Sequence, residues 1–178
     1  FKNLKKKYGK DYPRLTELTG FESIAVTRVV NNNAKLYANK AEGFVGINLK
    51  KEDNAEFICD CSDLSEIIVI RKDGKYLITK VSEKAFFGKD IVHVGLFDRN
   101  DQRTIYNVIY REGKTAVSYA KRFNVTSVTR DKEYDITQGT PGSTILWFTV
   151  NHNAEAETVK IYYRQRPKLK KLIDEYDF

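Results

Sequence analysis

The chain contains, at residues 65–98, the stretch SEIIVIRKDGKYLITKVSEKAFFGKDIVHVGLFD, in which two strand-forming runs flank a tight turn. The first run ends at Ile70, the turn is expected at Asp73-Gly74, and the second run extends from Lys75 to Val81. Asp-Gly between residues that favour β-strands is a strong hairpin signal, because both central residues of the usual two-residue turn need a positive φ. The stretch therefore predicts a β-hairpin whose turn places Lys72 opposite Lys75.

The same pattern recurs along the chain at irregular intervals of about 31–40 residues. Strand-forming runs flank turns in Lys35–Leu49 at Glu42-Gly43, in Thr104–Phe123 at Glu112-Gly113, and in Thr144–Arg164 at about Asn153. Repetition at this spacing is typical of blades that are stabilised by packing on their neighbours. The run Ile67–Ile70 is apolar on both faces, so it must be covered on both sides. We therefore expect an all-β, propeller-like fold of about four blades.

The composition indicates a folded, β-rich protein, with 12 % aromatic residues and only 3 prolines in 178 residues. There is no methionine, which predicts that residue 1 is not a native start and that the chain is a piece of a larger protein or a processed one. A short helix is expected within residues 1–9, with Gly9 as its C-cap. No run approaches the ~20 apolar residues that span a bilayer. Cys59 and Cys61 would share one face of a strand, and such close neighbours rarely form a disulfide, so a reduced, cytoplasmic compartment is expected.

The formal net charge of +7 is unevenly distributed. Residues 1–14 and residues 164–171 each carry +5, whereas residues 172–178 carry −3. Residues 52–66 hold six acidic residues and no basic one. Such segregation is typical of a surface that attracts polyanions on one side only. The alternative is that lysine-rich surfaces merely keep the protein in solution.

Both predicted hairpin tips present like charges, with Lys72 opposite Lys75 and Arg111 opposite Lys114. Like charges directly opposite each other destabilise a sheet by roughly a few tenths of a kcal/mol, so two such pairs indicate a surface that meets an anion. The alternative is that the long, solvated side chains splay apart. Phosphate contacts by such residues give salt-sensitive binding with little base specificity. The predicted phosphate-binding residues are Lys72, Lys75, Lys80, Lys84, Lys89, Arg111, Lys114, Lys121, Arg122, Arg164 and Arg166.

No pattern indicates a catalytic or metal site with comparable strength. Cys59-x-Cys61 lacks a second pair of ligands, and the two histidines, His93 and His152, follow no ligand spacing. A Cys–His catalytic pair stays open, because spacing alone does not exclude it. In the segment 139–142, Pro141 removes an amide that a phosphate-binding loop would use, so this segment is better explained as a turn.

Six segments resemble the C-terminal domain of the A subunit of bacterial type IIA topoisomerases, and most closely the topoisomerase IV type. They are YGKDYPRLTEL (8–18), EGFVG (42–46), CDCSDLSEIIVIRKDGKYLITKV (59–81), RTIYNVIYREGK (103–114), KRFNVTSVTRDKEYDITQGTPGS (121–143) and AEAETVKIYYRQRPKLKKL (154–172). The resemblance implies a β-pinwheel, in which four-stranded, propeller-like blades exchange strands with their neighbours. It implies that residues 1–20 are the end of a helical connector and a linker, and that residues 21–178 form the pinwheel.

The resemblance also implies a function, the binding and bending of duplex DNA around a basic perimeter, and makes the basic residues above expected DNA contacts. The family's catalytic tyrosine lies in another domain, so no tyrosine here is expected to be catalytic and this fragment is expected to need no cofactor. ATP and Mg²⁺ would act in the parent complex, an A-subunit homodimer with an ATPase B subunit, in the cytoplasm on the nucleoid. The Gln-Arg-Arg-Gly-Gly-x-Gly box of gyrases is absent, since Gln102-Arg103 continues into Thr104 and Gln165-Arg166 into Pro167. This difference favours decatenation and relaxation over supercoiling.

Two other functions are compatible with the sequence. A protein-interaction propeller would use the acidic segment Glu52–Glu66 to bind a basic partner. A β-propeller enzyme would need a central pocket with convergent polar groups.

Overall fold

The structure, a computed structural model, describes residues 2–9, 11, 34–49, 54–167 and 169–178. Two units, residues 1–30 and 31–178, are described separately. In the first unit, α1 (Lys2–Tyr8) ends one residue before Gly9, which confirms the predicted short helix. The boundary predicted between residues 20 and 21 lies outside the described residues. In the part of the chain that the structure describes, no helix is long and apolar enough to cross a membrane.

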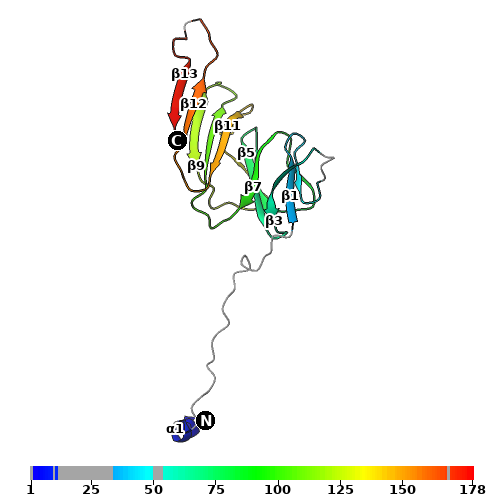
Figure 1. Ribbon diagram of the computed structural model, residues 1–178, viewed down its shortest axis with the longest axis vertical. Helices are drawn as coiled ribbons and strands as arrows, with labels where there is room; N and C mark the ends of the chain where they lie inside the picture. The colour runs from blue at the N-terminus through cyan, green and yellow to red at the C-terminus, as the bar shows by residue number, and fades with distance from the viewer. Residues whose placement is uncertain (1, 10, 12–33, 50–53, 168) are drawn as a thin grey trace. The chain divides into compact units, whose positions relative to one another are not determined.

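The second unit consists of β-strands, which confirms the all-β class (Figure 1). The strands are β1 (Ala34–Asn39), β2 (Phe44–Gly46), β3 (Glu56–Cys61), β4 (Glu66–Arg71), β5 (Lys75–Lys80), β6 (Ala85–Phe86), β7 (Ile91–Phe97), β8 (Ile105–Arg111), β9 (Ser118–Phe123), β10 (Glu133–Asp135), β11 (Thr144–Asn151), β12 (Thr158–Tyr162) and β13 (Ile173–Asp177).

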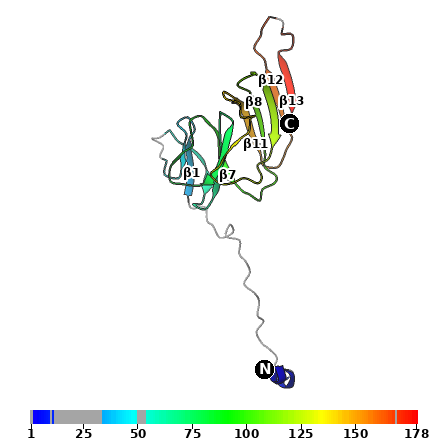
Figure 2. The ribbon, with the colours of Figure 1, turned by 180° about the vertical axis from the view of Figure 1, so that it is seen from behind.

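The strands form four antiparallel sheets, which correspond to the roughly four predicted blades. Sheet 1 has the order β3-β1-β2-β6, sheet 2 has β10-β5-β4-β7, sheet 3 has β11-β8-β9, and sheet 4 is the pair β12-β13. Figure 2 shows the same succession from behind, with β1 and β13 at opposite sides of the unit. Among the described residues, two sheets therefore have the four strands of a complete blade and two have fewer.

Strand exchange completes both four-stranded sheets. β6 lies between β5 and β7 in sequence but pairs with β2, with Phe86 opposite Phe44. β10 lies between β9 and β11 but pairs with β5, where Tyr134 is opposite Tyr76 and stacks on its ring at 5.5 Å. β9 pairs with β8 on one edge, and its other edge has no partner within the described ranges.

β4 forms the centre of the core because it is buried on both faces. Ile68 and Ile70 pack with the apolar residues of sheet 3, such as Val108. Ile67 and Val69 point the other way and pack with those of sheet 1. Alternate residues of a strand face opposite sides of its sheet, so one apolar run contacts two neighbouring blades. The prediction that this run is covered on both sides is confirmed.

The predicted two-residue turn between β4 and β5 is wrong. Ile70 pairs with Tyr76, so the loop has three residues, 72–74, and Arg71 rather than Lys72 stands across from Lys75. Only Gly74 in this loop has a positive φ, of 85°. A type I turn followed by one left-handed residue produces this three-residue loop, whereas the predicted turn needs two positive φ values. The hairpin predicted at Glu42-Gly43 does form, with a four-residue loop between β1 and β2.

The other two predicted turns are also corrected. Arg111 pairs with Ser118, not with Lys114, because the loop after β8 extends from residue 112 to residue 117 and its left-handed residue is Ala116, with a φ of 57°. The segment near Asn153 closes no hairpin, since β11 pairs with β8 and β12 pairs with β13. It instead links sheet 3 to sheet 4.

Candidate nucleic-acid interface

Three exposed cations lie at one end of sheets 2 and 3. The carbonyl of Lys72, in the β4–β5 loop, accepts a hydrogen bond from the amide of Ile145 at 2.8 Å. Arg111 is paired with Thr144, the neighbour of Ile145. Lys114 follows Gly113, whose amide donates to the hydroxyl of Ser143 at 3.2 Å. We call Lys72, Arg111 and Lys114 the turn cluster, because the start of β11 brings both loops together.

The cations of the turn cluster have no hydrogen-bond or ion-pair partner for their side chains within the described parts of the chain. The adjacent acidic side chains are occupied by other groups. Asp73 is bound by Arg71, with an Nη2–Oδ2 distance of 3.0 Å. Glu112 accepts hydrogen bonds from the hydroxyls of Thr115 and Thr140, which lower its pKa. The turn cluster therefore presents three exposed cations, of which Lys114 interacts electrostatically with the carboxylate of Glu112.

Lys75 differs from the turn cluster because it contacts the exchanged strand β10. Its Nζ lies 3.6 Å from Glu133, and Arg71 binds the same carboxylate at 2.8 Å. Arg71 also donates to the carbonyl of Phe87, next to the other exchanged strand, at 3.0 Å. Arg71 thus connects both exchanged strands to β4. Sequence reasoning missed this role, since Glu133 lies in a different part of the chain and no local pattern links the two.

The other predicted lysines are distributed along the sheets. Lys89 is 3.7 Å from Glu42, and Lys84 lies over the ring of Phe44 at 5.0 Å. Lys121 donates to the carbonyl of Ile136 at 2.9 Å. Lys80 stands opposite Glu66, at the end of β5 far from the turn cluster. A six-residue strand spans about 17–20 Å, so Lys80 is separated from the turn cluster by the length of β5.

Arg122 anchors sheet 4 to sheet 3. Its guanidinium donates to the carbonyls of Ala154 at 2.9 Å, Glu155 at 3.2 Å and Phe178 at 3.2 Å. These contacts hold the loop before β12 and the end of β13. Because three of its donors are engaged inside the protein, Arg122 has a structural role that its position in a basic stretch did not reveal.

Glu157 adds a second anchor at the same junction. Its carboxylate accepts hydrogen bonds from Thr149 at 2.6 Å, Asn107 at 2.9 Å and Asn151 at 3.0 Å. These hydrogen bonds, from Thr149 above all, lower the pKa of Glu157. The loop before β12 is thus fixed to β8 and β11 by a charged group with several donors.

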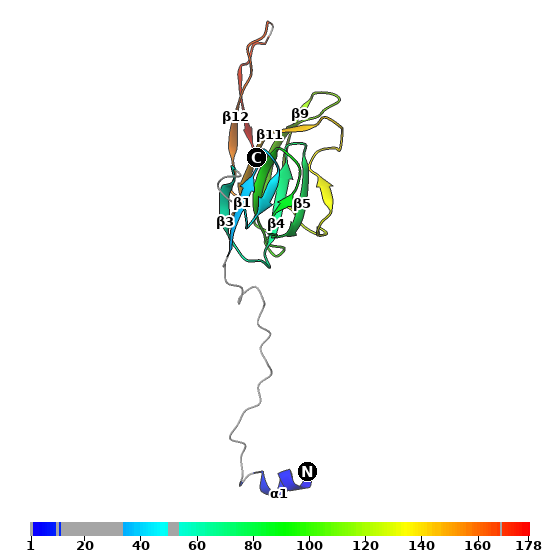
Figure 3. The same cartoon turned by 90° about the vertical axis from the view of Figure 1, so that its right-hand side faces the viewer.

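Arg164 and Arg166 lie in the segment that joins β12 to β13, far from the turn cluster in sequence. Both are exposed, and neither has a side-chain partner in the described part of the chain. Figure 3 shows this segment beyond the ends of the other sheets. The structure therefore presents two groups of unpaired cations, the turn cluster and the tip of sheet 4.

The acidic segment is less available than its sequence suggests. Glu66 accepts hydrogen bonds from Arg99 at 2.7 Å and from Arg130, and these arginines lower its pKa. Glu56 forms an ion pair with Lys40. Asp60 is exposed on β3, while residues 52 and 53 lie outside the described residues. Two of the four described acids are thus already neutralised by cations of the protein.

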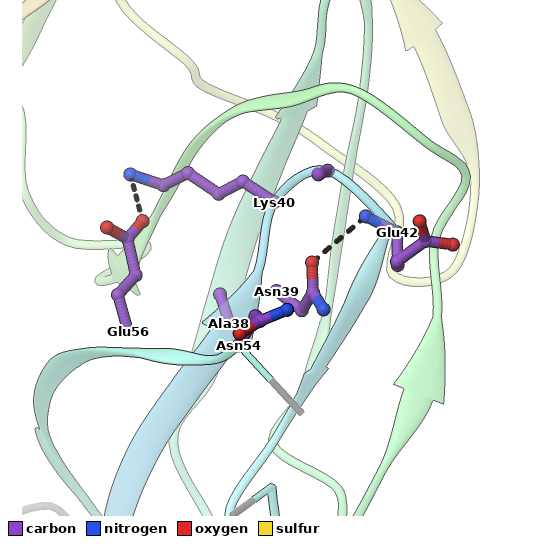
Figure 4. A pocket seen from close by; sticks show the side chains of 7 residues that line it. Ala38, Asn39, Lys40, Glu42, Asn54 and Glu56 are labelled. Carbon is purple, nitrogen blue, oxygen red and sulfur yellow. Dashed lines mark hydrogen bonds and ion pairs between the residues drawn. The ribbon is translucent and has the colours of Figure 1, made fainter. Parts of the chain in front are cut away.

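A pocket of about 290 Å³ lies beside the β1–β2 loop (Figure 4). It is lined by residues 38–42 with Asn54 and Glu56. Two pairs of its polar groups contact each other: Lys40 with Glu56, and the amide of Glu42 with the side-chain oxygen of Asn39 at 3.0 Å. The pocket lies at the end of sheet 1 and does not have the central position that a propeller enzyme would need.

The cysteines and histidines lie in different environments. Cys59 and Cys61 are free thiols on β3 that contact the same apolar cluster, as predicted, and burial raises the pKa of each. Burial lowers the pKa of His93 to about 4, so its ring is neutral, and it lies tilted against the ring of Phe148 with 5.5 Å between the ring centroids. His152 contacts the hydroxyl of Thr104 at 3.2 Å. The described residues include no group of three His, Cys, Asp or Glu side chains that could hold a metal ion.

These features define an all-β domain of strand-exchanged blades with two groups of cations, at the adjoining ends of sheets 2 and 3 and at the tip of sheet 4, that form no ion pair within the described residues. The topoisomerase C-terminal domain family described for the Bacteroidota matches residues 35–178. The match covers most of the chain, and the chain belongs to this family.

One relative is the A subunit of DNA topoisomerase 4 from Borreliella burgdorferi, which is 32 % identical over 130 residues. The alignment covers 72 % of this chain and 20 % of that subunit, so the chain spans about one fifth of the length of its relative. No solved structure matches the chain. The predicted resemblance to the C-terminal domain of a type IIA topoisomerase A subunit is confirmed.

Proposed function

We propose that this domain binds and bends duplex DNA without base specificity. The observation that carries the proposal is the presence of exposed cations that lack partners inside the described protein, in a domain of the topoisomerase C-terminal family. Folded proteins usually distribute surface cations among acids, as Lys75, Lys89 and Arg71 do here. Unpaired cations grouped on neighbouring loops instead favour a polyanionic partner.

The proposed contacts are made with phosphates. The turn cluster would bind one part of the duplex backbone, and Arg164 and Arg166 would bind another. Lysine and arginine contacts to phosphate position a protein on the duplex but carry no direct base information. Affinity would therefore vary little with sequence and would fall steeply with salt, because each contact releases condensed counterions.

The proposal extends to the protein in which this domain occurs. The relative named above is a topoisomerase subunit, so this domain would present DNA to the strand-passage core of a type IIA enzyme. That enzyme would be an A-subunit homodimer with an ATPase B subunit, located in the cytoplasm on the nucleoid. ATP and Mg²⁺ would be used there, and the domain itself would need no cofactor. The missing Gln-Arg-Arg-Gly-Gly-x-Gly box supports the topoisomerase IV type of activity.

A mobility-shift titration tests the proposal. The whole 178-residue chain is titrated onto duplexes of equal length and different sequence, at about 50 and 200 mM salt. We expect similar affinities for all duplexes and a loss of at least a hundredfold at the higher salt. Absence of binding at 50 mM salt, or tight binding that salt does not change, would contradict the proposal.

A further inference from the structure

We infer that sheet 4 is an arm whose tip enters the minor groove of duplex DNA and bends the duplex there. The inference rests on the proposed DNA binding but concerns a different part of the domain from the turn cluster. It assigns an apolar wedge, made by Pro167 and Leu169, to the tip, and phosphate contacts to Arg164, Arg166 and Lys170.

The shape of sheet 4 is that of a narrow two-stranded ribbon. β12 and β13 are paired from Thr158–Asp177 to Tyr162–Ile173, and the amide of Tyr163 extends the ladder with a 2.8 Å hydrogen bond to Leu172. The strands of such a ribbon lie about 4.8 Å apart. In Figure 1 and Figure 3 the tip extends beyond the other sheets in two perpendicular views. It is therefore an accessible projection.

A tight turn forms the end of the ribbon. The amide of Leu169 donates to the carbonyl of Arg166 at 3.1 Å, which places Pro167 at the second position of a β-turn. Proline favours this position because its ring fixes φ near the required value. Pro167 and Leu169 are both exposed, and Leu169 has 41 % of its surface accessible. The turn thus presents two aliphatic side chains at its crest.

The charge around this crest has a single sign. The sequence contains no acidic residue from position 158 to position 173. Arg164, Arg166 and Lys170 are exposed and have no side-chain partner in the described segments, whereas Lys171 is bound to Asp174 at 2.8 Å. Aliphatic residues between cations match the chemistry of minor-groove arms, which wedge apolar groups between base steps while arginine and lysine bind the phosphates.

The base of the ribbon is fixed to sheet 3, as a bending device requires. Arg122 holds the base of both strands, because it donates to backbone carbonyls in the loop before β12 and at the end of β13. Glu157 fixes the same loop to β8 and β11. At the end of β13, the ring of Phe178 stacks on Trp147 at 5.5 Å. A wedge can hold a kink in DNA only if the domain resists the restoring force, and these contacts transmit that force to the blades.

The same tip chemistry could contact an anionic lipid surface, but the structure favours DNA. Among the described residues of the crest the aliphatic side chains are Pro167 and Leu169, and other exposed apolar side chains, such as Leu172 and Ile173, lie toward the base of the ribbon, so the leading part of the tip offers little apolar area to lipid. The minor groove is favoured over the major groove because the crest combines an apolar wedge with arginines, the combination that minor-groove arms use to kink a duplex.

The test uses the whole chain and a duplex of about 40 base pairs with a fluorophore at each end. Energy transfer reports the bend, and anisotropy reports affinity. For R164Q/R166Q/K170Q we expect an affinity loss of about 100-fold near 0.15 M salt, from three phosphate contacts at about 0.9 in log–log slope each. For P167A/L169A we expect loss of the bend signal with a smaller change in affinity. Netropsin, a minor-groove ligand, should displace the arm and abolish the bend.

Matched controls separate the possible outcomes. L146A removes another exposed leucine, on β11, and K35Q/K40Q removes Lys35 on β1 and Lys40 just after its end; both variants should keep the bend. Circular dichroism shows whether each variant folds. The inference would be overturned if P167A/L169A and L169A both bend the duplex as the wild type does. It would also be overturned if methyl green, a major-groove ligand, abolishes the bend and netropsin does not. Tip variants that lose only binding to vesicles of phosphatidylglycerol and phosphatidylcholine would overturn it as well. If the wild-type chain binds no duplex, the proposed function itself fails, which is a distinct result.

Discussion

Removal of the turn cluster should change the salt dependence of DNA binding by a defined amount. Within the described residues, six cations at the two proposed contact regions form no hydrogen bond or ion pair through their side chains: Lys72, Arg111, Lys114, Arg164, Arg166 and Lys170. If each binds one phosphate, the slope of log K against log salt is about −5, from about 0.9 per contact. The variant K72Q/R111Q/K114Q keeps half of these contacts, so its slope should be about −3.

This difference is large enough to measure by fluorescence anisotropy. Between 50 and 200 mM salt, log salt rises by about 0.6, so the wild-type affinity should fall by about three orders of magnitude and that of the variant by about one and a half. The control K35Q/K40Q changes one lysine on β1 and one just after its end, beside the acidic strand β3, and should keep the wild-type slope. Parallel salt plots for the wild type and the triple variant would refute the assignment of the turn cluster to phosphate contacts.

Four further outcomes are expected. I68A removes a fully buried side chain at the centre of the core and should reduce the free energy of unfolding by about 2–5 kcal/mol in urea denaturation. Arg99 and Arg130 lower the pKa of Glu66, so its contribution of about 1 kcal/mol to the free energy of unfolding is present above the ordinary carboxyl pKa. This contribution is lost as pH falls through the lowered pKa. E66Q should therefore be less stable than wild type near pH 7 and equal to it in strong acid. Backbone amides of β9 should exchange with deuterium faster than those of β5, since β5 pairs on both edges and β9, among the described residues, on one. R122A should increase exchange in β12 and β13 with little change in β4, and equal exchange in the wild type would show that the three carbonyl contacts do not anchor the ribbon.

The all-β class and the position of the central strand could be predicted because they depend on local patterns. Four consecutive β-branched residues, Ile67–Ile70, favour a strand and leave no polar face, so two covering layers follow from the sequence alone. The cysteines on β3 were placed on one face by the same alternation. Family membership followed from longer segments, and the family match confirms it.

Turn geometry could not be predicted to the residue. The two-residue loop at 73–74 needs a positive φ at both Asp73 and Gly74, whereas the three-residue loop at 72–74 needs it at Gly74 alone, and Asp-Gly is compatible with both. In the loop after β8, the left-handed residue is Ala116, which rarely takes this conformation, and not Gly113. Each one-residue change in a loop changes which side chains face each other, so the predicted like-charge pairs were wrong although the loops were located correctly.

Strand exchange determines which cations remain available for a partner. β10 brings Glu133 from a later part of the chain to the tip of the β4–β5 hairpin, where it neutralises Arg71 and Lys75. Lys72, one residue beyond Arg71 on the loop, has no such counter-ion in the described structure. The exchanged strand thus divides one basic stretch of sequence into a pair that stabilises the fold and a residue that faces solvent. Ion pairs with exposed partners contribute little to the free energy of unfolding. The main consequence of pairing Glu133 with Arg71 and Lys75 is therefore that Lys72 is the cation of this stretch that keeps its charge available to a partner. If this division is functional, E133Q should raise DNA affinity by freeing Lys75 next to the turn cluster, with Arg71 still bound to Asp73, whereas an unchanged affinity would confine DNA contacts to other parts of the domain.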